Sequence, residues 1–146
     1  MFIRDLVTAD ELPALEQSLR FSAQRQRVIA HNIANIDTPN FQPLDVSIDG
    51  FRQTLGRAIE DREKAWGGKR GALELRETRE LKRNDRGLLE LRPTTEGDNI
   101  LFHDRNNRSL ERLMQQLQEN TAEFTATTEL MRAKMDLLRT AVTETR

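Results

Sequence analysis

The chain has 146 residues, of which 36% are hydrophobic and 32% charged, and its formal net charge is −1. So low a hydrophobic content argues against a large globular core, whereas long amphipathic helices that each bury one stripe remain feasible. The near-zero charge balance argues against a general polyanion-binding protein and permits self-association. The absence of cysteine excludes a disulfide framework and a thiolate metal site. No apolar run is long enough for a membrane-spanning helix or a cleavable signal.

The first predicted element is a helix over residues 12–37, about 40 Å long at 1.5 Å per residue. Steps of three and four residues place one set of positions on a single narrow face. This N-terminal stripe consists of Leu12, Leu15, Leu19, Ser22, Gln26, Ile29, Ile33 and Ile36. Its two polar members can fix the register or partner of a helix. Arg20, Arg25 and Arg27 lie off the stripe, on an edge expected to face solvent or another subunit.

A stop signal follows this helix in residues 31–41. Asn32 and Asn35 share a face of the last turns, where amide side chains can bond carbonyls that lack an intrahelical partner. Pro39 disfavours the helical conformation at Thr38, so the helix is predicted to end by about Asp37. An ordinary helix C-terminus with polar caps and a proline also explains this arrangement.

Residues 42–108 are predicted to be the least regular part of the chain. Asp49 can cap a shorter helix through Trp66, which Gly67-Gly68 would end. Two short strands at residues 73–75 and 89–91 are predicted around a turn at residues 84–87. Charges of both signs alternate over residues 69–92, which favours solubility or subunit contacts over nucleic-acid binding.

The last predicted element, a helix within residues 109–146, has the most regular pattern of the chain. An unbroken repeat of four and three residues continues for about four and a half heptads, which indicates a coiled-coil-type partner. This C-terminal stripe consists of Leu110, Met114, Leu117, Thr121, Phe124, Thr128, Met131, Met135, Leu138 and Val142. Asn107 or Ser109 can cap the start of the helix.

These elements predict a mainly α protein whose long terminal helices pack antiparallel as a coiled-coil-like hairpin. The irregular middle segment, with its short helix and β-hairpin, is expected as an insertion at one end. The chain then divides into residues 1–41, 42–108 and 109–146 within one elongated unit. The burial of two stripes gives a modest favourable free energy, which the loss of conformational entropy on folding nearly cancels. The isolated chain is therefore expected to be marginally stable, with partly disordered ends, and to order on assembly.

The run over residues 24–41 resembles the N-terminal signature of the bacterial flagellar rod, hook and hook-associated proteins. That signature reads Ala-Asn-Ile-Ala-Asn-x-x-Thr-Pro-x-aromatic. The matching residues here are Asn32, Ile33, Ala34, Asn35, Thr38, Pro39 and Phe41. His31 and Asn40 stand where alanine and glycine are usual, and asparagine tolerates the left-handed backbone that glycine supplies. The C-terminal helix matches more loosely, through Leu110-Glu111, Asn120 and a phenylalanine in place of the usual tyrosine.

Within that family, the short chain and the Thr-Pro-x-Phe ending are most similar to subunits of the proximal rod. The resemblance implies a structural subunit that polymerises through its terminal helices into part of the hollow axial drive shaft. It further implies export through the flagellar type III apparatus without a cleaved signal, and a location in the basal body on the periplasmic side. The implied partners are other rod proteins, the rod base protein, the export gate and further copies of the chain. The signature residues would fix how the N-terminal helix leaves the tube wall.

No catalytic, cofactor or metal site is expected from the sequence, nor a nucleic-acid or small-molecule ligand. His31 and His103 are far apart and neither has ligand spacing around it. Glu60, Asp61 and Glu63 fit a solvated helix face better than an acid–base pair. The alternative function is a cytoplasmic coiled-coil adaptor or regulatory protein with one helical partner, and arginine-rich RNA binding is a more distant one. An adaptor explains the heptads equally well and leaves the Asn-Ile-Ala-Asn-x-x-Thr-Pro ending unexplained.

Overall fold

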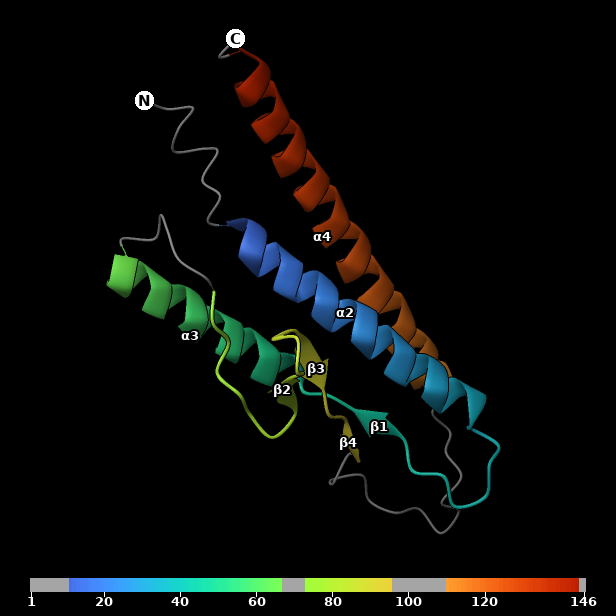
Figure 1. Ribbon diagram of the computed structural model, residues 1–146. Helices are drawn as coiled ribbons and strands as arrows, with labels where there is room; N and C mark the ends of the chain where they lie inside the picture. Colours follow the sequence, from blue (N-terminus) through green and yellow to red (C-terminus); the bar gives the residue numbers. More distant parts are fainter. Residues whose placement is uncertain (1–10, 67–72, 96–109, 145–146) are drawn as a thin grey trace.

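A computed structural model describes residues 11–66, 73–95 and 110–144 of the chain. Its helices are α2 (Glu11–Ala34), α3 (Ile48–Trp66) and α4 (Leu110–Glu144). Its strands are β1 (Leu44–Asp45), β2 (Leu81–Arg83), β3 (Leu89–Leu91) and β4 (Thr94–Thr95). Figure 1 shows α2 between α4 on one side and α3 with the strands on the other. The prediction of a mainly α protein is confirmed.

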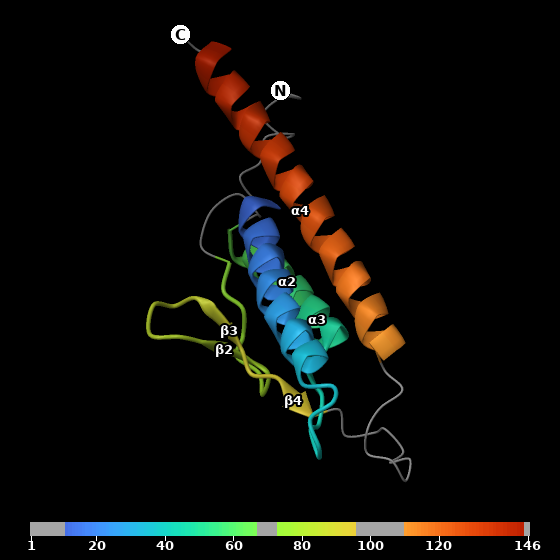
Figure 2. The same cartoon turned by 90° about the vertical axis from the view of Figure 1, so that its right-hand side faces the viewer.

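The terminal helices pack side by side and run antiparallel, as predicted. Near the end of α2, Gln26 contacts Asn120 in the first half of α4. At the start of α2, Glu11 forms an ion pair with Lys134, at 2.7 Å. Because α4 has 35 residues and α2 has 24, α4 continues past the first residue of α2 (Figures 1 and 2). None of the described helices is long and apolar enough to cross a membrane.

Ser47 caps α3 and fixes its first turn. Its hydroxyl accepts a hydrogen bond from the Gly50 N–H at 2.9 Å, and its carbonyl accepts one from the Phe51 N–H at 3.0 Å. The prediction that Asp49 is the cap is therefore wrong. Asp49 lies within the first turn instead, where a carboxylate interacts favourably with the helix dipole.

Strands β2 and β3 form an antiparallel hairpin in which Leu81 pairs with Leu91. The predicted turn and second strand are confirmed, and Gly87 takes the left-handed conformation, with φ 73°. The first predicted strand, residues 73–75, is wrong. The Asn84 N–H donates to the Leu88 carbonyl at 2.9 Å and closes the turn. Because the turn is this short, the strand that pairs with β3 lies directly before Asn84, at Leu81–Arg83.

A second two-stranded sheet joins parts of the chain that are distant in sequence. Leu44 of β1 lies opposite Thr95 of β4, and Asp45 lies opposite Thr94, in antiparallel register. This sheet was not predicted, because strands of two residues are too short to show an alternating pattern.

The hydrophobic core lies between α2, α3 and the β2–β3 hairpin. Phe21 of α2 stacks on Phe51 of α3, with ring centroids 4.0 Å apart and an interplanar angle of 9°. The other buried members of this cluster are Val46, Leu75, Leu81, Leu89 and Leu91. The prediction that the middle segment is an insertion at one end is therefore wrong, because its leucines pack along the side of α2 and close a core there.

The face of α4 that contacts α2 is not the predicted C-terminal stripe. The buried residues of α4 are Leu113, Asn120 and Thr127, spaced by seven. In contrast, much of the C-terminal stripe is exposed: Leu110 46%, Met114 45%, Phe124 39%, Met135 41% and Val142 72%. Leu117, Met131 and Leu138 are half-buried. The prediction that α2 buries this whole stripe is wrong, because α2 offers polar Ser22 and Gln26 at the middle of the contact.

Candidate functional site

A hydrogen-bonded turn ends α2 at the sequence signature. The Asn35 side chain donates to the His31 carbonyl at 2.8 Å, and the Asn35 carbonyl accepts from the Thr38 N–H at 2.9 Å. The Phe41 N–H then donates to the Thr38 carbonyl at 3.1 Å. Asn40 has φ 61°, in agreement with the left-handed conformation that asparagine tolerates at this position. The signature thus reverses the chain direction within a few residues.

Asn32 ties the chain beyond this turn back onto α2. Its side chain is 2% exposed, donates to the Leu44 carbonyl at 2.6 Å and accepts from the Leu44 N–H at 3.0 Å. The amide therefore satisfies both backbone groups of a β1 residue, as a neighbouring strand would. The prediction that Asn32 bonds a free helix carbonyl is wrong. Asn35 does bond a helix carbonyl, that of His31, but this carbonyl also accepts from the Asn35 backbone N–H at 3.2 Å.

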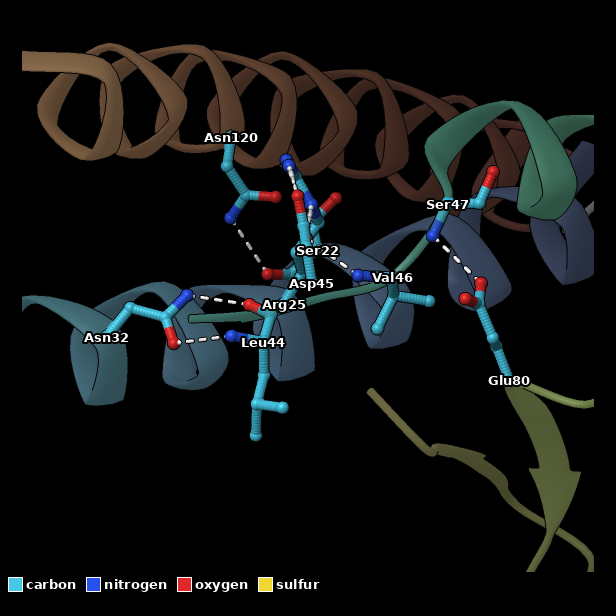
Figure 3. A network of polar contacts seen from close by, with 9 residues as sticks. All are labelled: Ser22, Arg25, Asn32, Leu44, Asp45, Val46, Ser47, Glu80 and Asn120. Atoms are coloured by element: carbon cyan, nitrogen blue, oxygen red, sulfur yellow. Dashed lines mark hydrogen bonds and ion pairs between the residues drawn. The ribbon is translucent and has the colours of Figure 1, made fainter. Parts of the chain in front are cut away.

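Arg25 forms a buried ion pair with Asp45 of β1. The guanidinium donates through Nε at 3.0 Å and through Nη2 at 2.9 Å to the two carboxylate oxygens. The two side chains are 3% and 18% exposed, so the prediction that Arg25 lies on an edge facing solvent or another subunit is wrong. The same carboxylate accepts from the Val46 N–H at 2.7 Å. Figure 3 shows these contacts together with those of Asn32.

Glu80 extends the network to the start of α3 and to β4. One carboxylate oxygen accepts from the Ser47 N–H at 2.9 Å (Figure 3). The other accepts from the Thr94 hydroxyl at 3.0 Å. Its own carbonyl accepts from the Arg92 N–H at 2.7 Å. One residue therefore connects the α3 cap to the chain on both sides of the hairpin.

Gln24 binds the backbone of β3 in the way that Asn32 binds β1. Its amide donates to the Leu89 carbonyl at 2.6 Å, and its side-chain oxygen accepts from the Leu91 N–H at 2.9 Å. Two amide side chains of α2 therefore form hydrogen bonds with backbone groups of two short strands.

A polar layer connects α2 to α4. Asn120, which is 1% exposed, donates to the Ser22 carbonyl at 2.9 Å and to the Gln26 side-chain oxygen at 2.6 Å. Gln26 in turn donates to the Thr121 hydroxyl at 3.3 Å. The Ser22 hydroxyl oxygen and Asn120 Oδ1 are buried without a hydrogen-bond partner. Ser22 and Gln26 are the two polar members of the N-terminal stripe, and a role for them in fixing register stays a prediction.

The remaining predicted residues differ in their exposure. Among the signature residues, Ile33 and Phe41 are half-buried, whereas Ala34, Thr38 and Pro39 are exposed. The Phe41 ring meets His31 edge-on, with centroids 5.6 Å apart. On the N-terminal stripe, Ile29 is 1% exposed, and the half-buried members are Leu12, Leu15, Leu19, Ile33 and Ile36.

Sequence reasoning missed Phe21, Gln24 and Arg25 as structural contacts. A signal for two of them exists, because Phe21 and Arg25 are four residues apart and Asn32 follows after seven, which defines a second face of α2. No comparable signal points to Gln24. Its partner is the backbone of a strand 65 residues away, and that contact depends on the folded arrangement.

Within the described ranges, no group of three or more His, Cys, Asp or Glu side chains is arranged to hold a metal ion. His103 lies outside these ranges. Hydrogen bonds of several polar side chains join one element to another, namely those of Gln24, Arg25, Asn32, Glu80 and Asn120. The fold and the site therefore define a helical protein whose polar network holds segments in fixed positions.

Residues 21–42 match a family model described as Flagella basal body rod protein. This match supports a place in a flagellar basal-body rod family. Such a family implies a structural role, a location in the flagellar basal body and association with other rod components. A search of curated proteins and a search of solved structures each gave no significant match.

Proposed function

We propose that the chain is a structural subunit of the proximal rod of the bacterial flagellar basal body, of the kind represented by the proximal rod protein FlgB. One observation carries this proposal. The segment that matches the rod family, residues 21–42, also contains the residues that join α2 to its neighbours. Gln24 bonds β3, Arg25 and Asn32 bond β1, and Gln26 bonds Asn120 of α4.

In this function the terminal helices contribute to the wall of the hollow drive shaft, and the subunit polymerises through them. The exposed C-terminal stripe of α4 supports this role, since an assembly would bury apolar side chains that the single chain leaves in water. The subunit contacts other rod proteins, the rod base protein and the export gate, and it leaves the cytoplasm without loss of a signal peptide. The turn at Asn35, Thr38, Pro39 and Phe41 fixes the angle between α2 and the segment that follows it.

The test is deletion of the gene in its native host, followed by isolation of basal bodies. We expect the chain to be present in parental basal bodies by mass spectrometry, and the deletion strain to keep the membrane ring and lack rods by electron microscopy. Complementation with Asn35→Ala or Pro39→Ala is expected to restore synthesis without rod assembly. Gln42→Ala, an exposed change just beyond the turn, is the control that should restore motility. Rods in the deletion strain, or full motility with both turn variants, would contradict the proposal.

A coiled-coil adaptor in the cytoplasm is the second candidate, and the exposed stripe on α4 favours it equally. The location of the chain separates the two functions. Uncleaved chain in the flagellar fraction supports the rod subunit, whereas chain confined to the cytoplasm together with intact rods supports the adaptor.

A further inference from the structure

Six of the ten residues of the C-terminal stripe are exposed on a side of α4 that α2 leaves open, whereas Leu117, Thr128, Met131 and Leu138 are half-buried. In Figure 2, α2 lies along one side of α4, and α4 forms the edge of the molecule. Exposed stripe residues occur at both ends and in the middle of the helix, including Leu110 at 46%, Phe124 at 39% and Val142 at 72%. A stripe of this length, about four and a half heptads, is sufficient for a stable two-helix contact.

The threonines in the stripe do not interrupt its apolar character. The Thr121 hydroxyl donates to the Leu117 carbonyl at 2.7 Å, and the Thr128 hydroxyl donates to the Phe124 carbonyl at 2.8 Å. Each hydroxyl proton therefore has an acceptor within the helix, so a partner can cover these side chains without leaving a donor unsatisfied. The Thr121 hydroxyl also accepts from the Gln26 amide of α2 at 3.3 Å, so Thr121 lies at the boundary between α2 and the exposed part of the stripe.

The charges beside the stripe indicate which partner fits and in which direction. One exposed row follows the stripe at every seventh residue: Glu111, Gln118, Thr125, Arg132 and Arg139. The row is acidic at its start, basic at its end and neutral at its midpoint. Two such rows in antiparallel orientation bring Glu111 of each chain to Arg139 of the other. A parallel pair would leave Glu111 of each chain far from Arg139 of the other, so this favourable contact would be lost.

We propose that the C-terminal stripe binds the same stripe of a second copy of the chain, antiparallel, about a two-fold axis near Thr125. The flanking pair of Glu111 and Arg139 is centred on residue 125. The apolar pairs are centred one residue further, at 126, and set Met114 against Leu138, Thr121 against Met131, and Phe124 against Thr128. Such an interface is isologous, so every favourable contact occurs twice. The net charge of −1 per chain gives little repulsion between copies. The pairing rests on the proposed function and deepens it, because it specifies how the terminal helices of two copies associate. It is tested on the isolated chain, so its failure is distinguishable from absence of the chain from rods.

The first test is the mass of the full chain in solution, measured by sedimentation equilibrium from micromolar to millimolar concentration. The expected result is a reversible monomer–dimer equilibrium. Phe124→Gln is expected to weaken dimerisation at least about a hundredfold, since it removes the burial of two aromatic rings per dimer. Ala126→Gln, on an exposed face of α4 beside the stripe, is the control with no loss of affinity. A chain that stays monomeric throughout overturns the proposal, as does equal weakening by both variants.

The second test establishes orientation by cross-linking, which is clean because the chain has no cysteine of its own. With a short bis-maleimide, Thr125→Cys chains should cross-link to each other, and a mixture of Glu111→Cys and Arg139→Cys chains should cross-link to mixed dimers. Val142→Cys alone should not, because its partner residue is Leu110. Cross-linking of Val142→Cys without cross-linking of the mixture indicates a parallel pair and overturns the proposal.

Charge reversal gives an independent check of the same register. Glu111→Arg and Arg139→Glu should each raise the dimer Kd about three- to tenfold, because each creates two like-charge pairs. The double variant should return the Kd to that of the original chain. Circular dichroism confirms that each variant keeps its helix content. Loss of affinity in the double variant beyond either single change overturns the assigned pairing.

Discussion

The side chain of Asn32 makes both of the hydrogen bonds that a β-strand partner would make to Leu44, at 2.6 and 3.0 Å. The chain leaves α2, passes through the signature turn and returns to within hydrogen-bond distance of the helix it has just left. The amide thus holds β1 against α2 at the point where β1 also meets β4.

Asn32→Ala should lower the free energy of unfolding by about 2 to 4 kcal/mol, because it removes a buried amide and leaves two partly buried backbone groups of Leu44 without this partner. Chemical denaturation followed by circular dichroism measures this change. Asn35→Ala is the matched control. Its bond to the His31 carbonyl is exposed, so the expected cost is below about 1 kcal/mol. Similar costs for the two variants would show that burial of the Asn32 amide is not the cause.

Removing one partner of the Arg25–Asp45 ion pair should lower the free energy of unfolding more than replacing both partners by apolar residues. Arg25→Met leaves the carboxylate partly buried beside an apolar side chain, with an expected loss of about 3 kcal/mol of unfolding free energy. The double variant Arg25→Met with Asp45→Leu should recover much of that loss, because neither charge remains. A double-mutant cycle measures the coupling between the two residues. A double variant no more stable than Arg25→Met would contradict this account.

Phe21→Ala should be among the most destabilising single changes, with an expected cost of about 3 to 5 kcal/mol for an aromatic ring removed from a packed core. Phe21 is 1% exposed and stacks on Phe51. Phe41→Ala removes the same side chain from a half-buried position and should cost clearly less. Unfolding by denaturant compares the two variants, and equal costs would show that the core does not depend on the Phe21–Phe51 stack.

Acid should weaken the β2–β3 hairpin through Glu77. The Arg83 N–H, at 3.2 Å, and then the Lys82 ammonium lower the pKa of this carboxyl below its ordinary value. A carboxylate with a lowered pKa stabilises the fold above its unfolded pKa, and this contribution is lost as the pH falls through the folded value. A pH titration of the Glu77 carboxyl by NMR should show the low midpoint. Glu77→Gln should remove this acid-dependent loss of hairpin stability. Arg83→Ala keeps the backbone N–H donor, so it should leave the midpoint of the Glu77 titration nearly unchanged.

Local patterns were sufficient to predict the helices, their antiparallel contact and the turn at Asn84. These depend on helical periodicity and on residues such as Gly87 that favour one backbone conformation. The core could not be predicted in the same way, because Phe21 and the leucines of the middle segment belong to short, separate patterns. The polar contacts of Gln24 and Arg25 were missed for a related reason. From sequence alone, a polar side chain on a helix is predicted to face solvent, because the strand that covers it comes from elsewhere in the chain.

The C-terminal stripe is exposed because another face of α4 contacts α2, and the sequence does not show which face does so. The periodicity of α4 identifies an apolar face and says nothing of which neighbour covers it. In the fold, the face with Asn120 meets α2, where the Asn120 amide donates to the Gln26 side-chain oxygen and to the Ser22 carbonyl. A buried polar layer therefore decided the rotation of α4 and left the apolar face available.

Three consecutive residues of α2, namely Gln24, Arg25 and Gln26, bind β3, β1 and α4 respectively. Successive positions of a helix point about 100° apart, so the three bonds fix α2 in three directions at once. Turning the helix about its axis, or sliding it by a single residue, would break all three connections together. We therefore expect force applied to α4 to be carried through α2 into the strands without slippage, which the proposed function in a rod would require.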